Sequence, residues 1–183
     1  ERAPGLPESE NEESPFDLPS RSNFCLQVRN RIAEWKRGGP KFSVILLEVN
    51  HPDPISNNET TRESANLVVA KYLAATIREM DAIGHYSPGC FALLLPTAGL
   101  ADAIRLAERI REGLSLTQGE RNAITLSVGV VQVMEKDDYV WLLKRAESAL
   151  DAADRKGGNR AYCHDGERCA PITSMLETMN YLS

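Results

Sequence analysis

The sequence from Arg78 to Pro96 reads Arg-Glu-Met-Asp-Ala-Ile-Gly-His-Tyr-Ser-Pro-Gly-Cys-Phe-Ala-Leu-Leu-Leu-Pro, and this stretch decides the fold. A short run ending at Tyr86 and an apolar run starting at Cys90 flank residues 87–89, which read Ser-Pro-Gly. The backbone preferences of these three residue types favour a tight reversal between two strands. The stretch therefore predicts a β-hairpin with its tip at 87–89.

Residues with helical or strand periodicity flank the hairpin on both sides. The first helix starts after a cap at Ser20 or Ser22 and runs to Trp35. The order helix, strand, helix, hairpin, helix, strand, helix, strand predicts an α/β (α+β) fold, with helices packed on a sheet that contains antiparallel strands. The other predicted helices cover 61–77, 102–114 and 138–156, and the other predicted strands cover 42–49, 123–133 and, as a final edge strand, 160–163.

Several motifs surround the hairpin. An Arg-x-x-Asp segment at 78–81 precedes the tip by five residues, and Leu-Leu-Leu-Pro and a helix follow the tip. Together with Phe-Asp-Leu-Pro-Ser-Arg-Ser-Asn-Phe at 16–24, Leu-Ser-Val-Gly-Val at 126–130 and Gly-Gly-Asn-Arg at 157–160, this set resembles the GGDEF domain family of diguanylate cyclases. The family's tip reads Gly-Gly-Asp/Glu-Glu-Phe, so the tip here is degenerate. The resemblance implies the palm-like sheet of nucleotide cyclases and polymerases, with the hairpin at the former active site.

The chain is long enough for one domain with tails. Its 183 residues are 42% hydrophobic and can bury one substantial core. We expect a flexible acidic leader over 1–13, a GGDEF-like domain over 14–163, and a tail over 164–183 that forms a short helix. The tail's apolar spacing fits a helix packed back on the domain, or one that leads to a partner or a next domain. Because no initiator methionine opens the chain, we expect a fragment of a longer protein with a fused upstream or downstream signalling domain.

Charge and hydropathy exclude several classes of protein. The first 19 residues carry six carboxylates and one arginine, so they account for the whole net charge of −5. The residues after position 19 therefore have no net charge, which argues against a nucleic-acid-binding face. No apolar run approaches the roughly 20 residues that span a bilayer, and no signal peptide opens the chain. We expect a cytoplasmic protein with neither a membrane span nor a nucleic-acid partner.

The four cysteines are Cys25, Cys90, Cys163 and Cys169. Their scattered positions fit reduced thiols better than a disulfide framework. Cys163, His164 and Cys169 are conceivable metal ligands, but no second Cys/His pair completes a tetrahedral set. We predict no metal site and no cofactor.

The resemblance assigns the family's metal site to the end of the strand at 42–49 and to the tip. Glu48 matches the first metal carboxylate, and Asn50 stands in place of the second. Gly89 and Cys90 stand where the family has acidic tip residues. Glycine has no ligating side chain, and a thiol is a poor ligand for Mg²⁺, which prefers oxygen. One carboxylate is left where the joining of two GTP molecules requires a cluster.

The family's other phosphate contacts are replaced as well. Ser87 and Pro88 occupy the positions of the tip glycines, and Pro88 also removes an N–H donor. The basic residues of the last helix and its exit align with Asp154 and Gly158, and an aspartate repels a triphosphate.

The guanine-recognition positions align with Ser56 and Ala65. This region is two residues short, so Asn57 or Glu63 substitutes if the alignment shifts. With metal, phosphate and guanine contacts all replaced, the resemblance implies no catalytic residues and a catalytically inactive domain.

One ligand site of the family is retained. Arg78 and Asp81 stand at the spacing of its product-binding inhibitory site, and Arg109 falls at the matching position of the following helix. Arginine donates in pairs to guanine O6 and N7, a carboxylate accepts from guanine N1–H and the N2 amine, and guanidinium planes stack on purines. The resemblance implies that these three side chains bind cyclic di-GMP. The alternative interpretation is an ordinary surface ion pair between Arg78 and Asp81.

Three functions stay open at this point. The first is a receptor that binds cyclic di-GMP without making it and relays the signal to an attached domain or partner, with ligand-linked homodimerisation expected from the resemblance. The second is an interaction or dimerisation domain that binds no nucleotide. The third is an active diguanylate cyclase or a GTP-binding regulator, for which the chain lacks most of the required residues.

Overall fold

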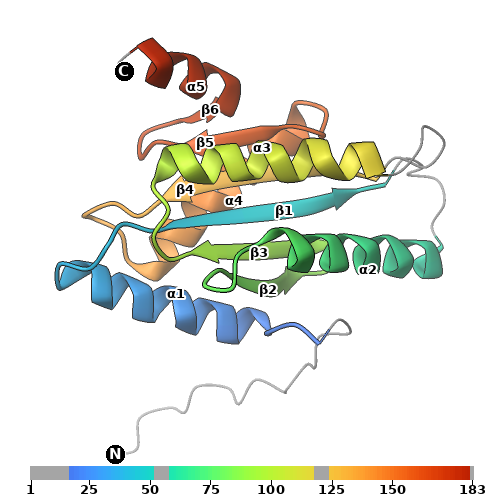
Figure 1. Ribbon diagram of the computed structural model, residues 1–183, viewed down its shortest axis with the longest axis horizontal. Coiled ribbons are helices and arrows are strands. Elements are labelled where there is room, and N and C mark those ends of the chain that lie inside the picture. The colour runs from blue at the N-terminus through green and yellow to red at the C-terminus, as the bar shows by residue number, and fades with distance from the viewer. Residues whose placement is uncertain (1–16, 52–57, 118–123, 182–183) are drawn as a thin grey trace, which may run out of the picture.

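A computed structural model of the chain describes residues 17–51, 58–117 and 124–181 (Figure 1). Its centre is one six-stranded sheet in the order β2-β3-β1-β4-β5-β6. The strands are β1 (Ser43–Asn50), β2 (Ala82–Ser87), β3 (Cys90–Leu95), β4 (Thr125–Gln132), β5 (Ala161–His164) and β6 (Cys169–Pro171). The helices are α1 (Arg21–Lys36), α2 (Glu59–Thr76), α3 (Leu100–Thr117), α4 (Tyr139–Arg155) and α5 (Ile172–Tyr181).

Helices cover both faces of the sheet, and Figure 1 shows α2 and α3 in front of it. Successive side chains of a strand point to opposite faces. Ile45 and Leu47 of β1 therefore join the core with α2 and α3, whereas Val44 and Leu46 join the core with α1 and α4. Burial on both faces explains why β1 reads as a continuous apolar run.

The sheet is mixed. The central β1 pairs antiparallel with β3 and β4, while β4 and β5 are parallel and are connected by α4. The predicted α/β (α+β) class with a palm-like sheet is confirmed. The predicted edge position of β5 is wrong, because β6 pairs antiparallel with its outer side. Strand β6 has three residues and ends in Pro171, so it is too short to show a strand pattern in the sequence.

The predicted hairpin is formed by β2 and β3, but its tip is shorter than expected. Ser87 is the last residue of β2 and pairs with Cys90, so that Pro88 and Gly89 alone form the turn. Gly89 has a φ of +73°, which favours glycine. A register shift between His85 and Ser87 marks a bulge next to the turn.

Side-chain caps start three of the helices. Ser20, rather than Ser22, caps α1, because its hydroxyl accepts a hydrogen bond from the Asn23 N–H at 3.4 Å. Asn58 and Asp138 cap α2 and α4 in the same way. The caps fix where each helix leaves the loop that precedes it.

The C-terminal tail returns to the sheet before it forms α5. Ile172 is buried in the core with α3, and Met175 and Leu176 pack against the same core. This part of the tail therefore packs on the domain. The acidic leader predicted over 1–13 lies outside the described residues.

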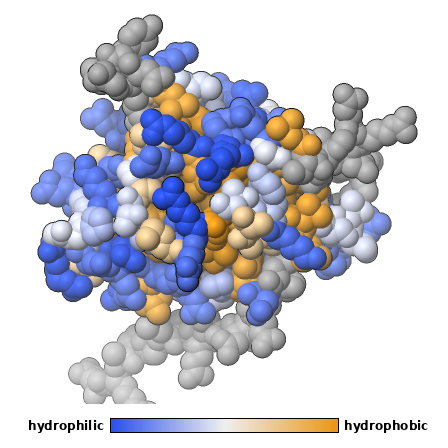
Figure 2. Space-filling model, in the orientation of Figure 1, coloured by the Kyte–Doolittle hydropathy of each residue, from blue (hydrophilic) through white to orange (hydrophobic). Residues whose placement is uncertain are grey.

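Figure 2 shows the α2 and α3 face by hydropathy, with hydrophilic residues across much of it and apolar residues visible between them. Within the described ranges, no helix is both long and apolar enough to cross a membrane.

Candidate functional site

Two regions contain the residues that the sequence singles out, and they lie at opposite ends of the β2–β3 hairpin. We name the first the arginine pocket and define it by Arg78, Asp81 and Arg109. We name the second the tip region and define it by Glu48, Asn50 and residues 87–90. The six residues of β2 separate the two regions by on the order of 20 Å.

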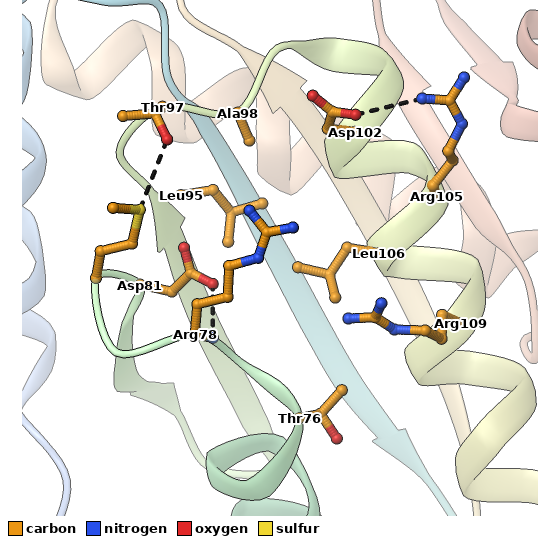
Figure 3. Close-up of a pocket in the computed structure, with 11 residues that line it drawn as sticks. Thr76, Arg78, Asp81, Leu95, Thr97, Ala98, Asp102, Arg105, Leu106 and Arg109 are labelled. Atoms are coloured by element: carbon orange, nitrogen blue, oxygen red, sulfur yellow. Dashed lines mark hydrogen bonds and ion pairs between the residues drawn. The ribbon is translucent and has the colours of Figure 1, made fainter.

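The arginine pocket is a cavity of about 360 Å³ between the α2–β2 turn, the β3–α3 connection and α3. The structure brings Arg78, Asp81 and Arg109 together around it, as the family resemblance implies (Figure 3). Leu95 and Leu106 supply apolar lining. The cavity therefore combines charged groups with apolar surface, as sites for flat heterocycles do.

A short turn orders the Arg-x-x-Asp segment. The Asp81 carboxylate accepts a hydrogen bond from the Arg78 backbone N–H at 2.9 Å, and the Asp81 N–H donates to the Arg78 carbonyl at 3.0 Å. Among the described residues, no ion pair joins the two side chains. The carboxylate thus holds the turn and leaves its second oxygen and the guanidinium available to a ligand.

The guanidinium groups of Arg78 and Arg109 face the same cavity (Figure 3). Both side chains are exposed, and within the parts of the chain that the structure describes neither makes a side-chain hydrogen bond or an ion pair. The neighbouring Arg105 differs, because it pairs with Asp102 at 3.3 Å. Two unpaired guanidinium groups in one cavity are suited to phosphate oxygens and to guanine edges.

Sequence reasoning missed part of the cavity's lining. Arg105 and Leu106 precede Arg109 on α3 by four and three residues, so helical spacing from Arg109 identifies them. Thr97 and Met80 line the cavity from a connection and a turn, where no periodicity applies.

The tip region, as defined, contains a single carboxylate, that of Glu48. Glu48 lines a cavity of about 660 Å³ under α2 and another of about 230 Å³ beside α4. Burial, and then the negative charges of Asp154 and Asp151, raise the pKa of Glu48 above its usual value. Asp154 thus adds negative charge where the resemblance expects a phosphate-binding cation.

The Asn50 side chain has a structural role. Its Oδ1 accepts a hydrogen bond from the Ser127 hydroxyl at 3.0 Å and another from the Asn159 N–H at 3.3 Å. Gly158, at a φ of +67°, lies so close that a Cβ there would be 3.2 Å from the same oxygen. The amide therefore ties the end of β1 to the loop after α4.

The hairpin tip offers no carboxylate. Cys90 is 3% exposed, and burial together with the charge of Glu48 raises the pKa of its thiol to about 12. Cys90 of β3 lies directly opposite Glu48 of β1 in the antiparallel register. Gly89 contributes backbone alone, and Pro88 has no N–H to donate.

Arg21, which lines the smaller tip cavity, already has partners. Arg21 pairs with Glu147 at 3.3 Å, and its guanidinium lies 4.3 Å from the centre of the Tyr86 ring. The Tyr86 hydroxyl donates to the same carboxylate at 2.6 Å. Burial and the hydrogen bond to Glu147 raise the pKa of Tyr86. These contacts fix the hairpin to α1 and α4.

The structure describes two of the candidate guanine-recognition positions, Ala65 and Glu63. Ala65 is buried in the core, so it cannot contact a base, whereas Glu63 lines the larger tip cavity. Ser56 and Asn57 lie outside the described residues. Asn66 also lines this cavity, and its Oδ1 is buried without a hydrogen-bond partner in the described structure.

All four cysteines are free thiols. His164 and Cys169 are directly opposed on β5 and β6, while Cys163 belongs to the core with α2 and α3. In the described ranges, no group of three or more His, Cys, Asp or Glu side chains is placed to hold a metal ion.

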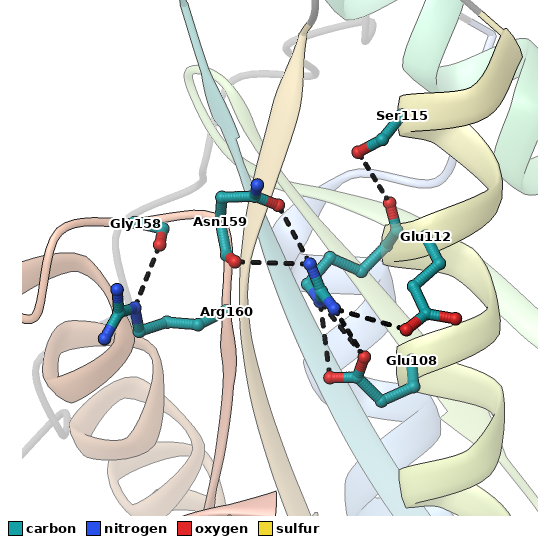
Figure 4. Close-up of polar contacts among 7 residues, drawn as sticks. Glu108, Glu112, Ser115, Gly158, Asn159 and Arg160 are labelled. Atoms are coloured by element: carbon teal, nitrogen blue, oxygen red, sulfur yellow. Dashed lines mark hydrogen bonds and ion pairs between the residues drawn. The ribbon is translucent and has the colours of Figure 1, made fainter. Parts of the chain in front are cut away.

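A polar network joins α3 to the loop after α4 (Figure 4). Arg111 donates to the Glu108 carboxylate at 2.6 Å and to the Asn159 Oδ1 at 3.0 Å. Its side chain is 18% exposed. On the same helix, Arg111 is therefore paired, whereas Arg109 has no side-chain partner among the described residues.

Most of the sequence matches known proteins. Residues 16–160 match the family described as diguanylate cyclase, GGDEF domain. Diguanylate cyclase DosC of Escherichia coli (strain K12) is 29% identical over 139 residues, which cover 72% of this chain and 30% of that protein. Response regulator PleD of Caulobacter vibrioides (strain NA1000 / CB15N) is 31% identical over 152 residues, which cover 78% of this chain and 33% of that protein. The chain spans about a third of the length of these two relatives.

Solved structures share the fold. The GGDEF domain of DgcB from Caulobacter crescentus, in complex with c-di-GMP, matches with a TM-score of 0.74 at 22% identity, over 82% of this chain and 93% of that one. The active GGEEF domain of a diguanylate cyclase from Vibrio cholerae matches with a TM-score of 0.73 at 23% identity, over 82% and 99%.

Proposed function

The chain belongs to the GGDEF domain family of diguanylate cyclases, and from this membership we propose that it is a receptor module that binds cyclic di-GMP at the arginine pocket without synthesising it. The observation that carries the proposal is the pair of guanidinium groups of Arg78 and Arg109 in one cavity with the ordered carboxylate of Asp81. Binding there is relayed to an attached domain or partner.

The chemistry of the ligand fits this set of groups. Each guanidinium can donate a pair of hydrogen bonds to guanine O6 and N7 or to a phosphate, and the free Asp81 oxygen can accept from guanine N1–H or N2. Leu95 and Leu106 offer apolar contact to the flat base. The similar DgcB domain was solved in complex with c-di-GMP, which supports the same ligand class.

The residues of the tip region support the proposal that the chain does not synthesise cyclic di-GMP. A GTP triphosphate with Mg²⁺ needs several oxygen ligands and cationic phosphate partners. Here the Asn50 Oδ1 already accepts hydrogen bonds from Ser127 and Asn159. Cys90 is a buried thiol, and Asp154 adds negative charge beside Glu48. The residues present do not fit a magnesium–triphosphate group.

A second candidate function is an interaction or dimerisation domain without nucleotide. The observation that favours it is the exposure of three apolar side chains in the first turn of α4, those of Tyr139, Val140 and Trp141. Exposed apolar groups of this kind are typical of protein contacts. This function predicts no response to cyclic di-GMP.

Calorimetric titration of cyclic di-GMP separates these functions. The wild-type chain and a Glu48→Ala variant are expected to bind with the same affinity, and an Arg78→Ala, Asp81→Ala variant is expected to show no saturable heat. Arg29→Ala, on the opposite face of the sheet, is the matched arginine control. Absence of heat in the wild type would reject the receptor and leave the interaction domain. Pyrophosphate release from GTP with Mg²⁺ would show a cyclase instead.

A further inference from the structure

Met80 is an exposed methionine in the wall of the arginine pocket. It lies in the turn between Arg78 and Asp81, whose two hydrogen bonds fix its backbone. Its side chain is exposed to 57% and lines the cavity. The Thr97 hydroxyl donates to its Sδ at 3.7 Å, and Figure 3 marks this contact. The thioether is therefore held between the turn and the β3–α3 connection, within reach of solvent.

We propose that Met80 contacts the ligand of the arginine pocket and that oxidation of its thioether by a peroxide weakens ligand binding. The inference rests on the proposed function. A thioether is apolar and polarisable, and it makes favourable contacts with aromatic rings. Met80 thus adds to the apolar surface that a purine meets beside the Arg78 guanidinium.

The oxidation is a two-electron step. A hydrogen peroxide molecule transfers one oxygen atom to Sδ, so that an S–O bond forms, the O–O bond breaks and water leaves. The sulfur is oxidised and the peroxide is reduced, and the product is methionine sulfoxide.

The sulfoxide changes the pocket in two ways. It replaces apolar surface with a polar group that has to be desolvated when a base packs on it. Its oxygen is also a strong acceptor in a cavity where the guanidinium groups of Arg78 and Arg109 have no acceptor among the described residues. The new oxygen therefore competes with the ligand for the same donors.

The other methionines provide a matched control. Met134 is also exposed, to 40%, but it packs against Gly166 at the β5–β6 turn and does not line the pocket. Met175 packs against the core. Met134→Leu therefore removes an oxidisable exposed methionine without touching the ligand site.

The test is the affinity for cyclic di-GMP before and after treatment with hydrogen peroxide. A thiol reductant is added after quenching to reverse thiol oxidation, and peptide mass spectrometry confirms the added oxygen on Met80. We expect the oxidised wild type to bind about tenfold more weakly. Met80→Leu, which keeps an apolar side chain of similar size in the wall, is expected to bind with the same affinity before and after peroxide treatment. Met134→Leu is expected to lose about tenfold on oxidation, like the wild type.

Three outcomes would overturn the inference. Unchanged affinity of a wild type with confirmed Met80 sulfoxide rejects it alone, as does a Met80→Leu variant that stays sensitive. Absence of binding by the untreated wild type rejects the proposed function and the inference with it. Recovery of affinity after treatment with methionine sulfoxide reductase supports the inference, because that enzyme reverses this modification specifically.

Discussion

The arginine pocket and the tip region carry opposite kinds of unused charge. In the pocket, Arg78 and Arg109 have no acceptor among the described residues, and Asp81 orders the turn that presents them. At the tip, Glu48 lies near Asp154, while the cation Arg21 is already paired with Glu147. We therefore expect an anionic nucleotide to be attracted to the first region and repelled by the second. Under the proposed function, charge compensation as well as the retention of motifs separates the ligand-binding pocket from the former active site.

The largest expected effect is on ligand affinity after Arg109→Ala. The loss of one paired hydrogen-bond donor is expected to weaken cyclic di-GMP binding about 100-fold. Because Arg109 is exposed and has no partner among the described residues, the free energy of unfolding is expected to stay within about 0.5 kcal/mol of the wild type. Calorimetry and urea unfolding measure the two quantities. If the variant binds cyclic di-GMP with wild-type affinity, the Arg109 guanidinium does not contact the ligand. The difference in charge between the two regions would then not explain binding.

The next effect is expected at Arg111, two residues further along α3. Arg111→Ala removes its hydrogen bonds to Glu108 and Asn159 (Figure 4), so we expect a loss of about 2 kcal/mol in the free energy of unfolding. Cyclic di-GMP affinity is expected to change less than about twofold, because Arg111 does not line the pocket. Urea unfolding and calorimetry check both. A large loss of affinity here would show that pairing does not separate structural from ligand-binding arginines.

The sequence predicts the fold and the pocket better than it predicts the tip. Apolar periodicity and turn residues are local signals, so they predict the hairpin and the helices that cover the sheet. The family resemblance assigns Arg78 and Arg109 to one site, and the structure places both around one cavity. The sequence does not show that Asn50 bonds to Ser127 and Asn159, since this contact joins residues 77 and 109 positions apart. It also misses β6, whose pairing with β5 depends on the turn between them.

A smaller effect is expected from salt. The Debye length falls from about 10 Å at 0.1 M ionic strength to about 3 Å at 1 M. Because the arginine pocket is open to solvent, we expect this change to weaken cyclic di-GMP binding about tenfold. Calorimetry at several sodium chloride concentrations measures the slope, with Arg29→Ala as a control that keeps it. An affinity independent of salt would show that apolar contacts, rather than charge, determine ligand affinity in the pocket. The difference in charge between the pocket and the tip would then not explain where the nucleotide binds.

The smallest effect is expected at the tip, from Glu48→Gln. The pKa of Glu48 is raised in the folded chain by burial and by Asp154 and Asp151, so the folded state binds its proton more tightly than the unfolded state does. The wild type therefore loses stability relative to the glutamine variant as the pH rises above about 4.5, the ordinary value, through the raised pKa. Thermal unfolding from pH 4 to pH 8 is expected to show the variant gaining on the wild type across this window, by less than the change at Arg111. If instead the stability of the wild type rises relative to the variant as the pH rises, a cation holds the Glu48 carboxylate. The contrast in charge between the tip region and the arginine pocket would then be lost.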